Sequence, residues 1–319
     1  MKKTIRFILL LVVVLGAAFF LFRTPDTDRE AMIATYTNPL SRFLDDGHGG
    51  KIHYRDEGNK DGPPILLIHG SNSMLQTWEP LVALLGDRYR VISLDLYGHG
   101  LTGPNPKGAY DAETYIAEAV KVLDAVGIER AYWVGNSMGG WLVWRAGLSV
   151  PERTSGLVLI DASGAQVAEK VKPYLGARVA QSSFGQMLLP EITPRFLVKS
   201  SLQESVAHPE RVTDELVDRY WELLRFPGNR QAAVDRAKTP REPEKWAEIG
   251  SLELPVLLLW GEQDKVIPLS HARAFASAIP QSKLLTYADA GHLPMEETPE
   301  QVARDIDAWI QAKDAAAAQ

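Results

Sequence analysis

The chain has 319 residues, of which 45% are apolar and 23% are charged, as is ordinary for a globular protein with a large core. A formal net charge of -6 gives no basic surface, so the sequence argues against nucleic-acid binding. There is no cysteine, which excludes disulfides, thiolate metal sites and a cysteine nucleophile.

The first 23 residues differ from the rest of the chain. Three basic residues precede an apolar run of sixteen residues, from Phe7 to Phe22. We interpret residues 1–23 as a single membrane anchor with its basic end in the cytoplasm, which places the remaining chain on the extracytoplasmic side, the periplasm in a Gram-negative cell. The alternative is a signal peptide cleaved near Gly16-Ala17-Ala18, followed by secretion.

Residues 24–43 are polar and predict a linker with a short helical stretch. Beyond them, apolar runs alternate with segments of helical spacing. We predict strands at 51–55, 65–68, 91–94, 131–134, 157–160, 256–260 and 284–286. We predict helices at 114–126, 138–148, 271–278 and 299–312. Continuous apolar runs separated by helices predict an α/β doubly wound domain, whose parallel sheet is covered on both faces.

One long stretch interrupts this alternation. Residues 164–250 show helical periodicity, prolines and mixed charge, but no convincing strand. Because they lie between two predicted strands, we expect a helical cap inserted over the carboxyl edge of the sheet. The core domain then consists of residues 44–163 and 251–314.

The strongest chemical signal is the sequence from Gly135 to Gly140, Gly-Asn-Ser-Met-Gly-Gly. It follows a predicted strand directly and precedes a predicted helix. A serine on such a sharp turn adopts strained backbone geometry, and glycines on either side remove the Cβ atoms that would clash. The helix also points its free N–H groups towards charge that develops near the serine. We therefore predict Ser137 as a nucleophile.

A serine nucleophile needs a base, and the base needs a carboxylate to orient it. His292 lies in a turn after the last predicted strand and is the best placed of the seven histidines. Asp264 follows the strand 256–260 and is our predicted acid. Asp161, at the end of the strand 157–160, is the alternative, whereas Asp289 more plausibly shapes the turn before His292.

An oxyanion hole requires two converging N–H groups. His69-Gly70-Ser71-Asn72 ends a predicted strand, so the backbone N–H of Ser71, or else that of Asn72, can meet that of Met138. The same glycine would also serve a simple turn between a strand and a helix.

These motifs together resemble the α/β-hydrolase superfamily over residues 50–312. Five pieces match, and the three that carry the triad occur in the order nucleophile, acid, histidine: His69-Gly70, Asp95-Leu96-Tyr97-Gly98-His99-Gly100, Gly135-Asn136-Ser137-Met138-Gly139, Gly261-Glu262-Gln263-Asp264 and Gly291-His292. The resemblance implies an eight-stranded sheet, a helical cap, and oxyanion N–H groups from Ser71 and Met138.

Within that superfamily, a serine at 137 argues against the haloalkane dehalogenases and epoxide hydrolases, which use an aspartate nucleophile. The elbow and the cap resemble the meta-cleavage-product hydrolases, which split carbon–carbon bonds. Those enzymes usually carry a glycine-rich stretch after His-Gly and a tryptophan after the histidine, whereas this chain has Ser71-Asn72-Ser73 and Leu293. We therefore expect a carboxylic ester hydrolase.

The remaining expectations concern partners. The substrate should be a small-molecule ester, and no metal or organic cofactor is required. A non-enzymatic, membrane-anchored binding protein on the same fold is the competing class, because a fold does not fix a function.

Overall fold

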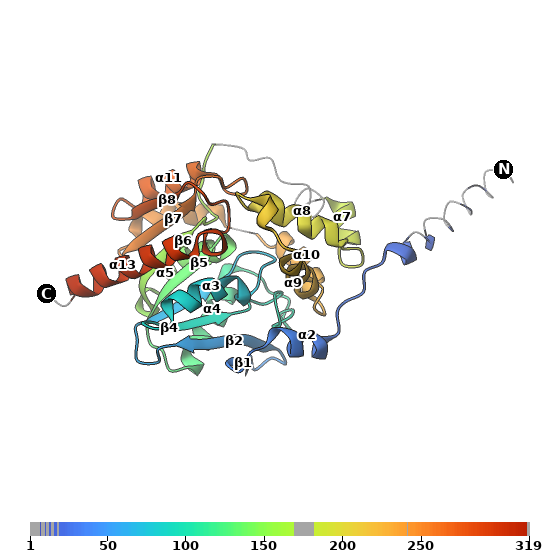
Figure 1. The fold of residues 1–319 in the computed structure, drawn as a ribbon, viewed down its shortest axis with the longest axis horizontal. Coiled ribbons are helices and arrows are strands. Elements are labelled where there is room, and N and C mark those ends of the chain that lie inside the picture. The colour runs from blue at the N-terminus through green and yellow to red at the C-terminus, as the bar shows by residue number, and fades with distance from the viewer. Residues whose placement is uncertain are drawn as a thin grey trace.

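The computed structural model describes residues 19–168, 182–240 and 242–317, together with positions 7, 10, 13, 16 and 17 (Figure 1). Its centre is an eight-stranded sheet in the order β1-β2-β4-β3-β5-β6-β7-β8. The strands are β1 Ser41–Asp45, β2 Lys51–Gly58, β3 Pro64–Ile68, β4 Arg90–Leu94, β5 Ala131–Asn136, β6 Thr154–Ile160, β7 Val256–Gly261 and β8 Lys283–Tyr287. β2 runs antiparallel to both of its neighbours, and all other pairs are parallel. The predicted fold class is confirmed.

Helices cover both faces of this sheet (Figure 1). The α-helices are α2 Arg29–Tyr36, α3 Glu79–Leu85, α4 Ala112–Ala125, α5 Met138–Ser149, α7 Ser183–Leu188, α8 Arg195–Ser205, α9 Asp214–Leu224, α10 Asn229–Lys238, α11 Leu269–Ala278, α12 Pro294–Glu297 and α13 Pro299–Ala317. Short 3-10 helices occur at η1 Leu75–Trp78, η2 Pro151–Arg153, η3 Pro209–Arg211 and η4 Pro243–Ser251.

Successive residues of the central strands enter two different cores. In β3, Leu66 and Ile68 belong to the core formed with α4, α5 and α11, whereas Ile65 and Leu67 belong to the core formed with α3 and α13. Because neighbouring side chains of a strand point to opposite faces, a fully apolar run is what a sheet covered on both faces requires. This is why the buried strands were recognisable in the sequence.

A buried carboxylate organises the loops that follow β3 and β4. Asp95 is fully buried and accepts hydrogen bonds from the backbone N–H groups of Leu75, at 2.7 Å, and Leu101, at 2.8 Å. Asp95 also contacts a side chain, that of His53 in β2, whose Nδ1 lies 2.7 Å from Asp95 Oδ2. Burial alone raises the pKa of Asp95, but His53 and the backbone donors together hold it below its ordinary value.

Between β6 and β7 the described residues form helices and no strand. This insertion comprises α7 to α10, which gather beside one end of the sheet (Figure 1), and the short helices η3 and η4, of which η4 packs with Trp246 against Trp144 of α5 and Phe275 of α11. Residues 169–181, part of the predicted cap, lie outside the described residues. The division into core and cap at 164 and 250 stays a prediction.

The segment interpreted as a linker, residues 24–43, contains more structure than expected. It includes α2, and β1 begins within it at Ser41. Residues near its start contact the helical insertion: the Thr24 N–H donates to Glu191 O at 2.8 Å, and Arg230 Nη2 pairs with Asp26 at 2.6 Å.

The predicted membrane anchor is wrong as stated: in the described part of the chain, no helix is long and apolar enough to cross a membrane. The membrane-anchored localisation that was inferred from this segment is therefore also wrong. Positions 1–6, 8, 9, 11, 12, 14, 15 and 18 lie outside the described residues.

The pair between His53 and Asp95 leads to a stability prediction. His53→Ala leaves a buried carboxylate without its side-chain partner, and removing one member of a buried pair costs about 3 kcal/mol or more. We expect the free energy of unfolding, measured by urea titration, to fall by about that amount. His48→Ala is the control, because the His48 side chain is exposed in the turn between β1 and β2. Equal effects of the two substitutions would contradict the role given to the pair.

Candidate active site

Ser137 occupies the sharp turn between β5 and α5. Its backbone dihedrals are φ 56° and ψ -116°, a left-handed conformation that is strained for a residue with a side chain. A Cβ on Gly139 would collide with the carbonyl oxygens of Ile68 and His69, and a Cβ on Gly135 would collide with the backbone of Gly139. Glycine is therefore required at both positions, and the turn leaves Ser137 partly exposed between two buried neighbours.

The end of β6 holds this strained turn in place. The Ser137 N–H donates to Ile160 O at 3.0 Å, and the Ser163 N–H donates to Ser137 O at 3.0 Å. Ser137 also lies at the N-terminus of α5, where the first N–H groups of a helix have no partner within it. The position therefore favours negative charge beside the serine hydroxyl.

His292 and Asp264 are brought together by the loops after β8 and β7. His292 Nδ1 lies 2.7 Å from Asp264 Oδ2, and both residues are buried. The other carboxylate oxygen of Asp264 accepts the backbone N–H groups of Val266, at 2.6 Å, and Ile267, at 2.9 Å. Because an ionised carboxylate only accepts hydrogen bonds, Nδ1 must be the donor. Nε2 of the neutral imidazole then carries the free lone pair, as a general base requires.

A side chain that the sequence analysis did not single out joins these loops to the elbow. Asn136, the residue before Ser137, is buried and donates through Nδ2 to His292 O at 3.0 Å and to Ile160 O at 3.2 Å. It therefore fixes the backbone of the histidine loop against the nucleophile strand. The only signal in the sequence was a polar residue at a position expected to be buried, between an apolar strand and the elbow.

Asp161, the alternative acid, lies in the same cluster but does not contact His292 by a described hydrogen bond. It is fully buried, with φ 43°, and its Oδ1 accepts the Gly261 N–H at 3.0 Å. Single ligand atoms of Asp161, Asp264 and His292 lie within 4.8 Å of one another, a grouping that a metal ion can use. However, the 2.7 Å contact between Asp264 and His292 is a direct hydrogen bond, which leaves no room for an ion between those atoms.

The other acids and histidines considered from the sequence have different partners. Asp289 is exposed and pairs with His208, with Oδ1 and Nε2 2.5 Å apart. His69 is buried, donates through Nδ1 to Gly70 O at 2.8 Å and accepts the Leu96 N–H through Nε2 at 3.1 Å. Burial lowers its pKa, so this side chain holds a turn in its neutral form.

The two residues expected to form the oxyanion hole are neighbours. The Ser71 hydroxyl donates to Met138 Sδ at 3.2 Å. A Cβ on Gly70 would lie 3.1 Å from Ser137 Cβ, so the backbone of this loop passes close to the serine. Asn72, the alternative donor, has φ 57°, and its side-chain oxygen accepts a hydrogen bond from Arg236 of α10 at 2.8 Å.

The helical insertion contacts both loops of the site. The hydroxyls of Tyr220, on α9, and Ser73 lie 3.3 Å apart, and Tyr220 donates to Glu296 Oε1 at 3.1 Å. The His292 N–H donates to Ser205 O, at the end of α8, at 2.7 Å. The insertion is therefore hydrogen-bonded to the loop beside the serine and to the loop that carries the histidine.

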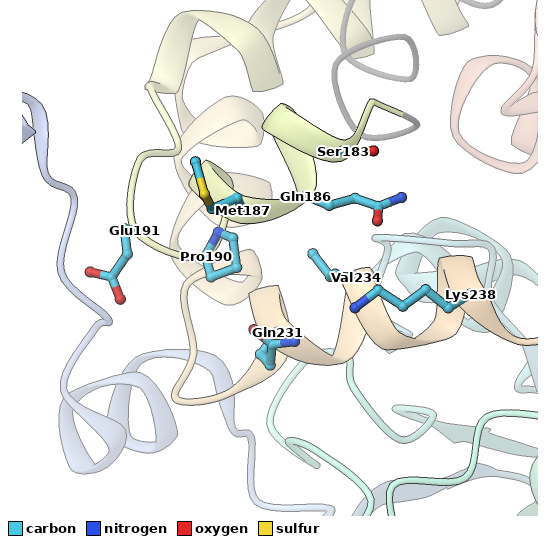
Figure 2. A pocket seen from close by; sticks show the side chains of 8 residues that line it. All are labelled: Ser183, Gln186, Met187, Pro190, Glu191, Gln231, Val234 and Lys238. Carbon is cyan, nitrogen blue, oxygen red and sulfur yellow. The ribbon is translucent and has the colours of Figure 1, made fainter.

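A hollow of about 430 Å³ lies within the insertion itself, between α7 and α10 (Figure 2). Met187, Pro190 and Val234 give it apolar walls, and Gln186 and Lys238 reach across it in Figure 2. No predicted catalytic residue lines this hollow. We therefore do not assign it to the reaction.

The model of the alpha/beta hydrolase fold family matches residues 63–299. The chain belongs to the alpha/beta hydrolase fold family. The resemblance predicted from the motifs is thus confirmed, and hydrolase chemistry is the general conclusion that the family supports.

The relatives include hydrolases of two kinds. A 2-hydroxymuconate semialdehyde hydrolase of Pseudomonas putida is 27% identical over 302 residues, which cover 92% of this chain and 97% of the relative. A pimeloyl-(acyl-carrier protein) methyl ester esterase of Aliivibrio salmonicida is 25% identical over 263 residues, covering 82% of this chain and 97% of the relative. A solved meta-cleavage product hydrolase of Pseudomonas fluorescens IP01 has a TM-score of 0.70 at 25% identity, covering 83% of this chain and 96% of that chain.

The hydrogen bond between His292 and Asp264 predicts how a serine-reactive fluorophosphonate probe will behave. Asp264→Asn keeps the shape of the side chain but favours the wrong imidazole tautomer, so labelling of Ser137 should slow by roughly 10^3-fold or more. Mass spectrometry of the labelled peptide measures the rate. Asp289→Asn is the control, since Asp289 lies three residues from the histidine but pairs with His208. If Asp161→Asn slowed labelling more than Asp264→Asn, Asp264 would not be the acid.

Proposed function

We propose that this protein is a carboxylic ester hydrolase that works through an acyl-enzyme on Ser137. Ser137 Oγ attacks the ester carbonyl carbon while His292 Nε2 accepts the hydroxyl proton. The tetrahedral intermediate collapses, the carbon–oxygen bond to the alcohol breaks, and His292 returns the proton to the leaving alcohol. Water, deprotonated by the same histidine, then attacks the acyl carbon and releases the acid together with free Ser137.

The observation that carries this proposal is the buried 2.7 Å contact between His292 Nδ1 and Asp264 Oδ2, next to a serine on a strained turn. Because Nδ1 faces the carboxylate, the neutral imidazole has its lone pair on Nε2. Asp264 remains ionised throughout and stabilises the imidazolium that forms when the proton is taken.

Stabilisation of the oxyanion is assigned to the backbone N–H groups of Ser71 and Met138. The support is the proximity of these residues, whose side chains are 3.2 Å apart, and the position of Met138 at the start of α5. Each donor of this kind contributes about 10²–10³-fold to the turnover number in well-studied serine hydrolases.

Cleavage of carbon–carbon bonds is the second candidate, because one relative is named a 2-hydroxymuconate semialdehyde hydrolase and one solved structure is named a meta-cleavage product hydrolase. An ester substrate is favoured by the departures noted in the sequence: Ser71-Asn72-Ser73 replaces a glycine-rich stretch, and Leu293 replaces a tryptophan. The polar loop beside Ser137 also takes part in the hydrogen bond to Tyr220.

We also propose that residues 164–250 act as a cap that shapes the acyl pocket. The support is the pair of contacts from this insertion, Tyr220 to Ser73 and Ser205 to His292. A cap of this kind determines which substrates fit, while the chemistry stays with residues of the core.

The proposed activity is tested first with p-nitrophenyl esters of increasing chain length. The wild-type chain should release nitrophenol, and Ser137→Ala should lower kcat by roughly 10^4-fold or more because the three groups act as one unit. Parallel assays with 2-hydroxymuconate semialdehyde test the second candidate, the hydrolysis of carbon–carbon bonds. Near-normal ester turnover by Ser137→Ala would refute the nucleophile, and efficient turnover of the semialdehyde alone would replace the ester proposal.

The cap contact is tested by Tyr220→Phe. The change removes the hydroxyl that joins α9 to Ser73 and Glu296, a hydrogen bond worth about 1 kcal/mol, so kcat/KM should fall about fivefold and the ranking of ester chain lengths should change. Tyr36→Phe is a matched control, because the Tyr36 hydroxyl also donates to a glutamate of the insertion, Glu222, at 2.7 Å, but from α2. Unchanged kinetics in Tyr220→Phe would show that this contact does not shape the pocket.

A further inference from the structure

Two buried carboxylates meet beside His292, and they differ sharply in their donors. Asp264 accepts three hydrogen bonds, from His292, Val266 and Ile267. Asp161 accepts one, from the Gly261 N–H to Oδ1. Its Oδ2 is buried and receives no donor from any residue that the structure describes, and one oxygen of this carboxylate lies within 4.8 Å of a carboxylate oxygen of Asp264.

Two ionised carboxylates are unfavourable in such a site, because both groups are buried and their like charges repel each other. The proton belongs on the carboxylate with fewer donors, because each donor to an ionised group stabilises its charged form. That carboxylate is Asp161. Burial, and then the charge of Asp264, raise the pKa of Asp161 well above its ordinary value, in agreement with this assignment.

We propose that Asp161 is a positioning residue, which keeps its proton and donates a hydrogen bond from Oδ2 to the carboxylate of Asp264. Oδ1 at the same time accepts the Gly261 N–H, so the side chain connects the end of β6 to the end of β7. The proton assignment stands on the geometry alone. The consequence for catalysis rests on the proposed function, in which Asp264 orients His292.

This arrangement has a chemical consequence for the acid. A fourth donor disperses the negative charge of Asp264, so that it stabilises the imidazolium without removing the Nδ1 proton. It also restrains the carboxylate plane, and with it the direction of His292 Nε2. Misplacement of a reacting group by about 1 Å can cost 10²-fold in rate.

The surroundings of Asp161 contain few other charges. The groups that act on it are Asp264 and His292 in the cluster, Glu297 on α12, and Tyr287 at the end of β8. Glu297 accepts backbone N–H groups from Gly291, at 2.9 Å, and Leu293, at 3.1 Å. None of the main causes of the raised pKa of Asp161 is the charge of a lysine or arginine.

The backbone conformation makes a discriminating pair of substitutions available. Asp161 has φ 43°, a region that asparagine tolerates well and that residues branched at Cβ avoid; leucine is branched only at Cγ. Asp161→Asn supplies an N–H donor in place of the protonated oxygen, whereas Asp161→Leu keeps the approximate volume without any donor. If Asp161 donates to Asp264, asparagine should rescue what leucine loses.

The experiment uses the full-length chain and begins with kinetics on a p-nitrophenyl ester. Asp161→Leu should lower kcat by roughly 10- to 100-fold with little change in KM, and Asp161→Asn should restore most of that loss. The pH profile of kcat/KM in Asp161→Asn should keep its wild-type midpoint. A loss in Asp161→Asn as large as in Asp264→Asn would overturn the proposal, because the ionised form of Asp161 would then be required.

Two measurements need no substrate and therefore test the proton even if the proposed function fails. Difference infrared spectra of wild type and Asp161→Asn at neutral pH should show one protonated carboxyl band that is present only in the wild type. Absence of that band would overturn the assignment.

The second measurement is the pH dependence of stability. Asp161 ionises more easily in the unfolded chain than in the folded one, so the wild type loses stability as the pH rises above the ordinary aspartate range, about 4. Asp161→Asn has no such group, and its free energy of unfolding relative to wild type should therefore increase between pH 4 and pH 8. A difference that is constant or decreases with pH would show that Asp161 is ionised in the folded state.

Discussion

The hydrogen bond between His292 and Asp264 is the interaction around which the site is built. It requires two loops, from β7 and β8, to meet at close range, and the structure achieves this with backbone contacts. A Cβ on Gly261 would collide with the carbonyl oxygens of Ala290 and Gly291, so the two loops can approach only where a side chain is missing. The Gln263 N–H then donates to Ala290 O at 3.0 Å. The position of the histidine therefore depends on a glycine that has no chemical role.

The same principle holds at the nucleophile. The turn at Ser137 brings α5 against the end of β3, a packing that Gly139 alone permits, and the strain at Ser137 is held by the end of β6. Asn136 connects this turn to the histidine loop. Hydrogen bonds thus join the ends of β5 and β6 to the loop that carries His292, and the helical insertion adds further hydrogen bonds through Tyr220 and Ser205.

Much of this arrangement was predictable because it depends on patterns that are local in the sequence. The buried strands appear as apolar runs, and the elbow appears as glycines spaced around a serine. Strand β1 was missed because Ser41–Asp45 lies at the sheet edge with no fully buried residue. Two features were missed: the hydrogen bond from Asn136 to the backbone of His292, and the pairing of His53 with Asp95. Both depend on contacts between residues far apart in the chain. The membrane anchor was predicted from the apolar run and the basic residues before it, but in the described part of the chain no helix is long and apolar enough to cross a membrane.

The central claim is that hydrolysis passes through an acyl group on Ser137. The most direct measurement is rapid mixing of the enzyme with a p-nitrophenyl ester, followed by acid quench and mass spectrometry of the intact chain and its peptides. We expect the acyl mass on the peptide that contains Ser137. When deacylation is the slower step, we also expect a burst of nitrophenol close to one equivalent of enzyme. Two results would contradict this mechanism. One is steady ester turnover with the acyl group on a residue other than Ser137, and the other is steady turnover with no acyl-enzyme in the quenched samples.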